Sequence, residues 1–155
     1  MDEAIMNVIL EKYHIRIGRK AAETLKMALG VEWDLNRDTR ICEVCGISTI
    51  TELPVKIAVT GEIVAQALNP ILYRIFSGIT SVIQMTPPAI LGDIREHGIV
   101  LLGGVAQLKG LNELVLKVTD MKAHVADHPS YVNAVGAGSA LEYMDYFRDS
   151  LQDLH

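Results

Sequence analysis

Residues 98 to 111 read Gly-Ile-Val-Leu-Leu-Gly-Gly-Val-Ala-Gln-Leu-Lys-Gly-Leu, and this stretch is the most informative part of the chain. The apolar run from Ile99 to Leu102 is typical of a buried strand. It is followed by Gly103 and Gly104 and then by a helical pattern from about Leu108 to Val118. Glycines at such a turn allow a ligand to approach the backbone, and the next helix offers unpaired N–H groups. The order of strand, glycine turn and helix predicts an α/β fold with a candidate nucleotide-binding turn, although such turns also occur in proteins that bind no nucleotide.

The N-terminal half of the chain alternates between helical and extended patterns. Apolar spacing predicts amphipathic helices at 2 to 13 and at 20 to 29, the second ended by Gly30. Residues 40 to 60 alternate between apolar and polar side chains, which predicts two or three short antiparallel strands. A helix is expected to begin after Thr60 as its N-cap and to break at Asn69-Pro70, because proline lacks an N–H donor.

The C-terminal half is expected to be mostly helical. The predicted elements are a helix at 70 to 85, a short helix from Pro87 to about Gly98, a strand near 122 to 126 and a last helix at 129 to 147. The last helix carries an apolar, aromatic end for core packing or for a partner's tail, formed by Tyr143, Met144, Tyr146 and Phe147. Together the patterns predict a large subdomain (1 to 30 and 69 to 155) with an incomplete sheet, and an inserted small α+β lobe (31 to 68).

The composition limits the classes of protein to which the chain can belong. Its 155 residues suffice for one domain or two small lobes, and half of them are hydrophobic. The net charge is −5 and no Lys/Arg cluster occurs, which argues against nucleic acid as the main partner. The longest nearly uncharged stretch, 63 to 85, has amphipathic helical spacing and is not expected to span a membrane. With no apolar signal segment at the N-terminus and only two cysteines, a cytoplasmic location is expected.

Glu23 and Lys26 are the candidate ligand-binding pair of the second predicted helix. Residues at positions i and i+3 share one face of a helix. A carboxylate and an ammonium side by side can accept from and donate to the two hydroxyls of a ribose. The alternative is a solvent-exposed ion pair, which contributes little to stability.

Two other pairs are expected to have structural roles. Cys42 and Cys45 have the spacing of a metal knuckle, but residues three apart on a strand point to opposite faces and a second cysteine pair is missing. They are therefore predicted to be ordinary thiols. His124 and His128 lie in a predicted strand and loop, where four-residue spacing does not place side chains on one face. No catalytic or metal-binding residue is predicted.

A series of motifs, in the same order along nearly the whole chain, resembles the C-terminal half of the MreB/Mbl family of bacterial actin-like proteins. The N-terminal motifs are Met1-Asp2-Glu3-Ala4-Ile5, Ile17-Gly18, Ala22-Glu23 with Lys26 and Gly30, Glu43-Val44 with Gly46, Leu53-Pro54 and Val59-Thr60 with Glu62-Ile63. The C-terminal motifs are Pro87-Pro88, Asp93-Ile94, Gly98 to Gly104, His124 to Pro129, and Gly136 and Gly138 with Ala140-Leu141-Glu142. The ordered set is far more specific than any one of its members.

The resemblance implies half of an actin-like, ribonuclease H-like ATPase fold that binds ATP or ADP with Mg²⁺ and assembles into cytoskeletal filaments that determine cell shape. It implies ribose contacts at Glu23 and Lys26, sugar and α-phosphate contacts at Gly103 and Gly104, and an adenine contact at Gln107. The family's first phosphate loop and its magnesium-binding acid belong to its N-terminal half, and its second phosphate loop belongs to a Gly-rich strand pair that precedes the region resembled by this chain. No ATPase activity is therefore expected from this chain alone.

The implied partners are further copies in a filament, a separate N-terminal half, and the tail of a membrane protein of the RodZ type, which would place the chain near the membrane. Val105 and Ala28 depart from the family's pattern, and a β-branched Val105 is expected to adopt positive φ with difficulty. They support an alternative, a degenerate actin-like adaptor that binds a protein partner without nucleotide. A sugar-kinase-like half of the same superfamily is a further alternative, but no sugar-binding carboxylate stands out.

Overall fold

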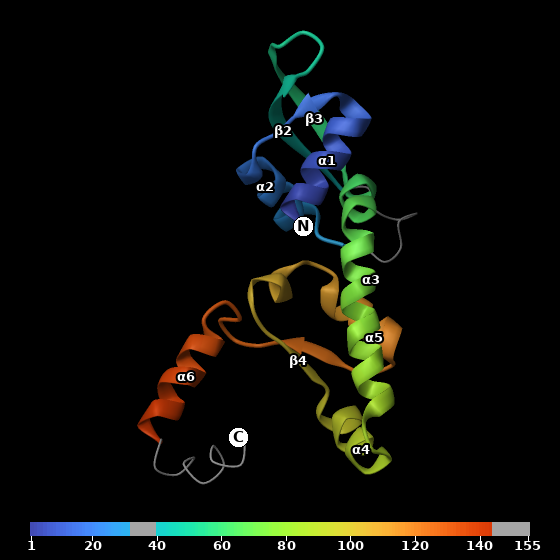
Figure 1. The fold of residues 1–155 in the computed structure, drawn as a ribbon, viewed down its shortest axis with the longest axis vertical. Helices are drawn as coiled ribbons and strands as arrows, with labels where there is room; N and C mark the ends of the chain where they lie inside the picture. The colour runs from blue at the N-terminus through green and yellow to red at the C-terminus, as the bar shows by residue number, and fades with distance from the viewer. Residues whose placement is uncertain (32–39, 144–155) are drawn as a thin grey trace.

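The computed structural model describes residues 1–31 and 40–143. The elements of the first half are α1 (Asp2–Tyr13), β1 (Ile15–Arg16), α2 (Arg19–Leu29), β2 (Ile41–Ser48), β3 (Pro54–Thr60) and α3 (Gly61–Met85). Those of the second half are α4 (Pro88–His97), β4 (Ile99–Leu101), the 3-10 helix η1 (Gly104–Gln107), α5 (Leu111–Thr119), β5 (Ala123–Val125) and α6 (Val132–Glu142). The molecule is elongated, with the β2–β3 hairpin at one end, α4 at the other, and α3 running along both parts (Figure 1).

The N-terminal part is an antiparallel sheet packed against helices. Its strand order is β1-β2-β3, and the β2–β3 register pairs Ile41 with Thr60 and Ile47 with Pro54. The predicted strands at 40 to 60 are therefore confirmed. α1 and α2 pack against each other and against the start of α3. The side chains that are essentially inaccessible to solvent in this core are Ile5, Ile9, Leu25, Leu29, Val59, Val64 and Leu68.

The expected break at Asn69-Pro70 is wrong, because α3 continues from Gly61 to Met85 with Pro70 inside it. Proline at this position removes one backbone hydrogen bond, the one that the carbonyl of Gln66 would accept. Leu68 and Leu72 are buried on either side of it. Their packing against the core stabilises a continuous helix despite the lost bond. Thr60 is the N-cap residue of this helix as expected, although its side chain makes no capping hydrogen bond.

The C-terminal part contains a second, parallel pair of strands. β4 pairs with β5 in the register Ile99–Ala123, Val100–His124 and Leu101–Val125. The strand at 99 to 102 is thus confirmed, but its expected burial is wrong: Val100 and Leu102 are 50% and 48% exposed. These two side chains lie two residues apart and share one face. Their exposure shows that this face of the β4–β5 sheet is uncovered within the part of the chain that the structure describes.

Packing groups the elements differently from the predicted subdomains. The sequence pattern groups residues 1 to 30 with residues 69 to 155, whereas α1 and α2 share their core with β2, β3 and the first half of α3. Leu108 and Leu111 join the same core from the C-terminal part. The boundary between a large subdomain and an inserted lobe at 31 to 68 stays a prediction, and residues 32 to 39 lie outside the described part.

The last described helix stands to one side of the molecule (Figure 1). No residue of α6 is buried, and Tyr143, which follows it, is 63% exposed. The other residues of the predicted aromatic end, 144 to 147, lie outside the described residues. No helix in the described part of the chain is long and apolar enough to cross a membrane.

Candidate functional site

Two segments far apart in the sequence are joined where α2 ends and α5 begins. The backbone N–H of Val31 donates to the carbonyl of Lys109 at 2.8 Å. Two glycines with positive φ make this close approach possible, Gly30 at 61° and Gly110 at 84°. A Cβ on Gly110 would lie 1.8 Å from the carbonyl oxygen of Val31, and one on Gly30 would lie 2.6 Å from Lys109. The junction of Gly30 and Val31 with Lys109 and Gly110, here called the glycine clasp, therefore fixes α2 relative to the loop before α5.

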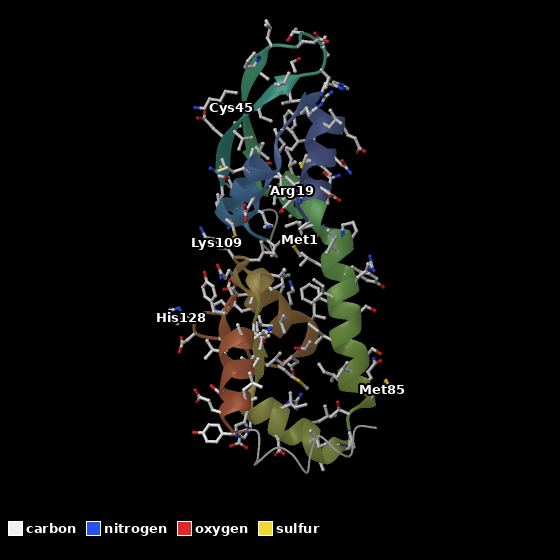
Figure 2. All side chains as sticks on the ribbon, turned by 60° about the vertical axis from the view of Figure 1, so that its left-hand side comes forward. Met1, Arg19, Cys45, Met85, Lys109 and His128 are labelled. Atoms are coloured by element: carbon white, nitrogen blue, oxygen red, sulfur yellow. The ribbon has the colours of Figure 1, made fainter. Side chains whose placement is uncertain are left out.

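A pocket of about 840 Å³ lies beside the glycine clasp, within the size range of small-molecule sites. Figure 2 labels Met1, which lines the pocket, and Lys109 of the glycine clasp. Both lie where the N-terminal part of the molecule, at the top of the view, meets the C-terminal part below it. The pocket is lined from the first part of the chain by Met1, Lys20, Glu23, Thr24, Lys26, Met27 and Ala28, and from the second part by Gly104, Val105, Gln107, Leu108 and Ser130. Four of the five residues predicted as a nucleotide site, Glu23, Lys26, Gly104 and Gln107, are thus brought together.

Gly103, the fifth predicted residue, lies next to the pocket and shapes its edge. Its φ of 86° is in the region that favours glycine. Its N–H donates to the carbonyl of Pro129 at 2.7 Å, which joins the turn to the loop after β5. A Cβ on Gly103 or on Gly104 would meet no atom within 4 Å. The backbone of this turn therefore borders open space, into which a ligand can approach closely.

Val105 does not adopt the positive φ that is difficult for a β-branched residue. It lies in η1 and is not among the described residues with positive φ, because Gly103 adopts that conformation two residues earlier. This agrees with the expectation that a β-branched residue adopts positive φ only with difficulty. Its side chain nevertheless lines the pocket and is 45% exposed. It offers an apolar surface to whatever the pocket binds.

Lys26 is held by a partner on another helix. Its Nζ donates to Oδ1 of Asp2 at 2.7 Å, and the two side chains are only 19% and 27% exposed. The hydrogen bond from Lys26 lowers the pKa of the Asp2 carboxyl below its usual value, against a smaller opposing effect of burial. Asp2 is therefore ionised throughout the neutral range. Glu23 lies one turn before Lys26 on α2 and lines the same wall.

Gln107 and Ser130 connect the opposite wall to the loop after β5. The Gln107 side-chain amide donates to the Ser130 hydroxyl oxygen at 2.7 Å. The sequence analysis did not single out Ser130, which is 23 residues from Gln107 and directly follows the His124 to Pro129 motif. The sequence analysis also missed three lining residues that helical spacing could have indicated, Lys20, Thr24 and Met27. They lie three or four residues apart on the helix that carries Glu23, so helical periodicity places them on one face.

The lining has the chemistry of a site for a sugar and an adjoining flat, partly apolar group. A carboxylate and an ammonium on one wall match a pair of hydroxyls, while Met27, Val105 and Leu108 supply apolar surface. The open backbone at Gly103 and Gly104 matches the close approach that a nucleotide's sugar and phosphate need. In residues 1–31 and 40–143 there is no group of three or more His, Cys, Asp and Glu side chains placed to hold a metal ion.

The pairs expected to be structural lie outside this pocket. Cys42 and Cys45 are free thiols on β2, the first half-buried and the second exposed. His124 is in β5 and faces a different, smaller depression, and His128 precedes the loop of Ser130. Neither pair contributes to the lining of the candidate site.

The fold defined by these elements is that of the actin-like proteins. MreB 5 of Spiroplasma citri, solved with AMPPNP bound, superposes with a TM-score of 0.82 over 96% of this chain and 44% of that chain, at 21% identity. A MamK double helical filament superposes with a TM-score of 0.68 over 84% of this chain and 39% of that chain, at 21% identity. The predicted actin-like α/β fold is therefore confirmed.

The family follows from the sequence comparison. The model of the MreB/Mbl protein family matches residues 1–149, and the chain belongs to this family. Two relatives are the cell shape-determining protein Mbl of Bacillus cereus, 32% identical over 93% of this chain and 43% of the relative, and the cell shape-determining protein MreB of Escherichia coli, 33% identical over 93% of this chain and 41% of the relative. The chain thus spans about two-fifths of the length of the curated relatives it matches.

Proposed function

We propose that this chain supplies the adenosine-binding wall of an ATP-dependent, actin-like filament subunit that takes part in determining cell shape. The observation that supports this most strongly is the convergence of Glu23 and Lys26 from α2 with Gly104 and Gln107 from η1 on one pocket. Relatives named for cell shape, and an MreB neighbour solved with a nucleotide analogue, support the same assignment.

In the proposed complex, the chain's own residues bind and orient the nucleoside. Glu23 accepts a hydrogen bond from a ribose hydroxyl and Lys26 donates one. The backbone at Gly103 and Gly104 borders the sugar and α-phosphate, and Gln107 contacts the adenine edge. When bound, the nucleotide supplies a phosphoanhydride bond. Its cleavage would depend on phosphate loops and a magnesium-binding acid, which in the family lie outside the region that this chain resembles.

The sugar contact of Glu23 can be tested by nucleotide binding. For the Glu23→Gln chain we expect about tenfold weaker binding of ADP, because a hydrogen bond to a charged group contributes about 1.5 to 3 kcal/mol and the amide replaces only part of it. For 2′,3′-dideoxy-ADP, which lacks both hydroxyls, we expect almost no difference between Glu23→Gln and the wild-type chain. Isothermal titration with both nucleotides measures this.

Glu11→Gln is the matched control, since Glu11 is exposed on α1 and does not line the pocket. It should bind ADP like the wild-type chain. Equal losses for ADP and its dideoxy analogue in Glu23→Gln would contradict a sugar contact. A wild-type chain that binds no ADP would favour the second candidate function, an actin-like adaptor that binds a protein such as a RodZ-type membrane-protein tail without nucleotide. Val105, which projects an apolar side chain into the lining, is the observation that favours this candidate.

We also propose that the uncovered face of the β4–β5 sheet is an assembly surface. Val100 and Leu102 are about half exposed on it, and parallel strands are normally covered on both faces. A second copy, or a separate polypeptide equivalent to the family's N-terminal half, would bury this face. A filament formed by MamK, a neighbour with the same fold, supports self-association.

Sedimentation velocity tests this surface. The wild-type chain is expected to associate more strongly as its concentration rises, and Val100→Lys is expected to suppress that association, because a lysine on an open sheet discourages contact with another chain. Val118→Lys is the matched control, since Val118 is 47% exposed on α5 and lies off the sheet. A wild-type chain that stays monomeric at all concentrations would argue against self-association, and an equal effect of both lysines would argue against this particular face.

A further inference from the structure

Asp2 contacts the candidate site only through another residue. Its carboxylate is bonded to the ammonium of Lys26, which lines the pocket, but Asp2 itself does not line it. Asp2 lies in the first turn of α1 and Lys26 in the last turn of α2, so the bond also joins the two helices. Both side chains are largely shielded from solvent. The pair is therefore less screened than an exposed ion pair and has a defined geometry.

The bond determines which donors Lys26 can offer. An ammonium group carries three N–H donors and accepts none. One donor is directed to Asp2, and two remain for a ligand in the pocket. The carboxylate of Asp2, which does not line the pocket, also balances the positive charge of Lys26.

Without Asp2, the side chain of Lys26 has a competing partner nearby. Glu23 precedes it by three residues on α2, the spacing at which a carboxylate and an ammonium on one helix pair with each other. Such a pair would occupy both groups proposed to bind the ribose. Asp2 keeps the ammonium of Lys26 bound on the α1 side, so that the carboxylate of Glu23 stays available to a ligand.

We propose that Asp2 is a positioning residue, which holds Lys26 against the pocket wall and keeps Lys26 and Glu23 apart so that both can bind a sugar diol. This inference rests on the proposed nucleotide site. It assigns a role to α1, a helix that contributes no predicted site residue.

The same turn of α1 contains a matched control. Glu3 accepts a hydrogen bond from Arg19 at 3.1 Å, and this ion pair also joins α1 to α2. Both of its side chains are highly exposed, at 80% and 72%, and neither lines the pocket. Glu3→Gln therefore removes an α1–α2 ion pair without disturbing Lys26.

The first measurement needs no nucleotide. The full chain is exposed briefly to an amine-acylating reagent, and the modification of each lysine is quantified by mass spectrometry. Asp2→Asn is expected to raise the acylation rate of Lys26 several-fold, because the ammonium would leave its largely shielded position beside Asp2 for the exposed side chain of Glu23, where the reagent reaches it more easily. Lys12 and Lys20 are expected to react as in the wild-type chain. Asp2→Glu should restore slow acylation of Lys26, and Glu3→Gln should leave it unchanged.

The second measurement is ADP binding in a double-mutant cycle. Asp2→Asn is expected to weaken binding roughly tenfold, as when one charged hydrogen-bonding group is no longer held in place. In a Lys26→Met background the same change should cost almost nothing, because Asp2 acts through Lys26. Asp2→Glu should recover most of the affinity, and circular dichroism verifies that each variant is folded.

The outcomes separate this inference from the proposed function. An unchanged acylation rate of Lys26 in Asp2→Asn overturns the inference, whether or not ADP binds. An equal loss of ADP affinity with and without Lys26 also overturns it, since Asp2 would then act only on the fold. If the wild-type chain binds no ADP, the proposed function fails, and the acylation rates alone decide whether Asp2 holds Lys26.

Discussion

Replacing Gly110 with alanine is expected to lower the free energy of unfolding by about 3 to 5 kcal/mol, the largest effect among the substitutions considered. The new Cβ would lie 1.8 Å from the carbonyl oxygen of Val31, so the backbone must move. The φ of 84° adds strain for any residue with a side chain. Moving the loop also breaks the hydrogen bond between Val31 and Lys109. Thermal and urea unfolding followed by circular dichroism measure the change.

Gly92→Ala is the matched control for this prediction. Gly92 lies in α4 and a Cβ there meets no atom within 4 Å, so alanine should be neutral or stabilise the helix by up to about 1 kcal/mol. Because the glycine clasp aligns the two walls of the pocket, ADP binding by Gly110→Ala should also weaken at a temperature where that variant is folded. Equal stability of the Gly110→Ala and Gly92→Ala variants would show that the clasp does not constrain the fold.

Leu25→Ala is expected to destabilise the chain by about 2 to 5 kcal/mol, because it leaves a cavity in the core. Leu25 is completely buried, and it lies on α2 between Glu23 and Lys26, on the face opposite the pocket wall. Its side chain anchors the helix that carries both proposed sugar contacts. Urea unfolding measures the change. If the unfolding free energy falls with urea concentration at the same slope in both proteins, the loss is one of native-state stability.

Leu10→Ala is the same substitution at a site that is 38% exposed on α1. There the loss should be well below that of Leu25→Ala, since a partly exposed side chain leaves no closed cavity. A loss at Leu10 as large as that at Leu25 would contradict the packing of α2 described here. It would indicate that the exposed face of α1 is covered by another part of the protein.

Much of the secondary structure was predictable from the sequence. The helices at 2 to 13 and 20 to 29, the C-terminal stop at Gly30 and the strands within 40 to 60 follow from apolar spacing and glycine, and all are present. The break at Pro70 was not correct, because a local rule about proline was outweighed by the packing of Leu68 and Leu72. A proline inside a helix costs about 3 kcal/mol, and the burial of two leucines, at about 1.5 to 3 kcal/mol each, offsets that cost.

The candidate site was predictable only where its residues belong to recognisable patterns. Glu23 and Lys26 were identified by their helical spacing and by the resemblance to the family. Gly103 and Gly104 were identified by the glycine turn between strand and helix and by the same resemblance, and Gln107 by the resemblance alone. The structure shows where these residues lie, whereas their contact with nucleotide stays a proposal. Asp2 and Ser130 belong to the site through hydrogen bonds that span 24 and 23 residues. No spacing within one helix or strand predicts contacts of that kind.

The amino-acid sequence by itself determined which family this chain belongs to and where most of its helices and strands lie, because both follow from the order and periodicity of its residues. The tertiary structure alone decided that α2 and η1 form two walls of one pocket, that Asp2 holds Lys26, and that the glycine clasp sets their separation. The physical reason is that these contacts depend on the positions of whole helices. Those positions are set by the shared core, to which residues from Ile5 to Leu111 contribute together.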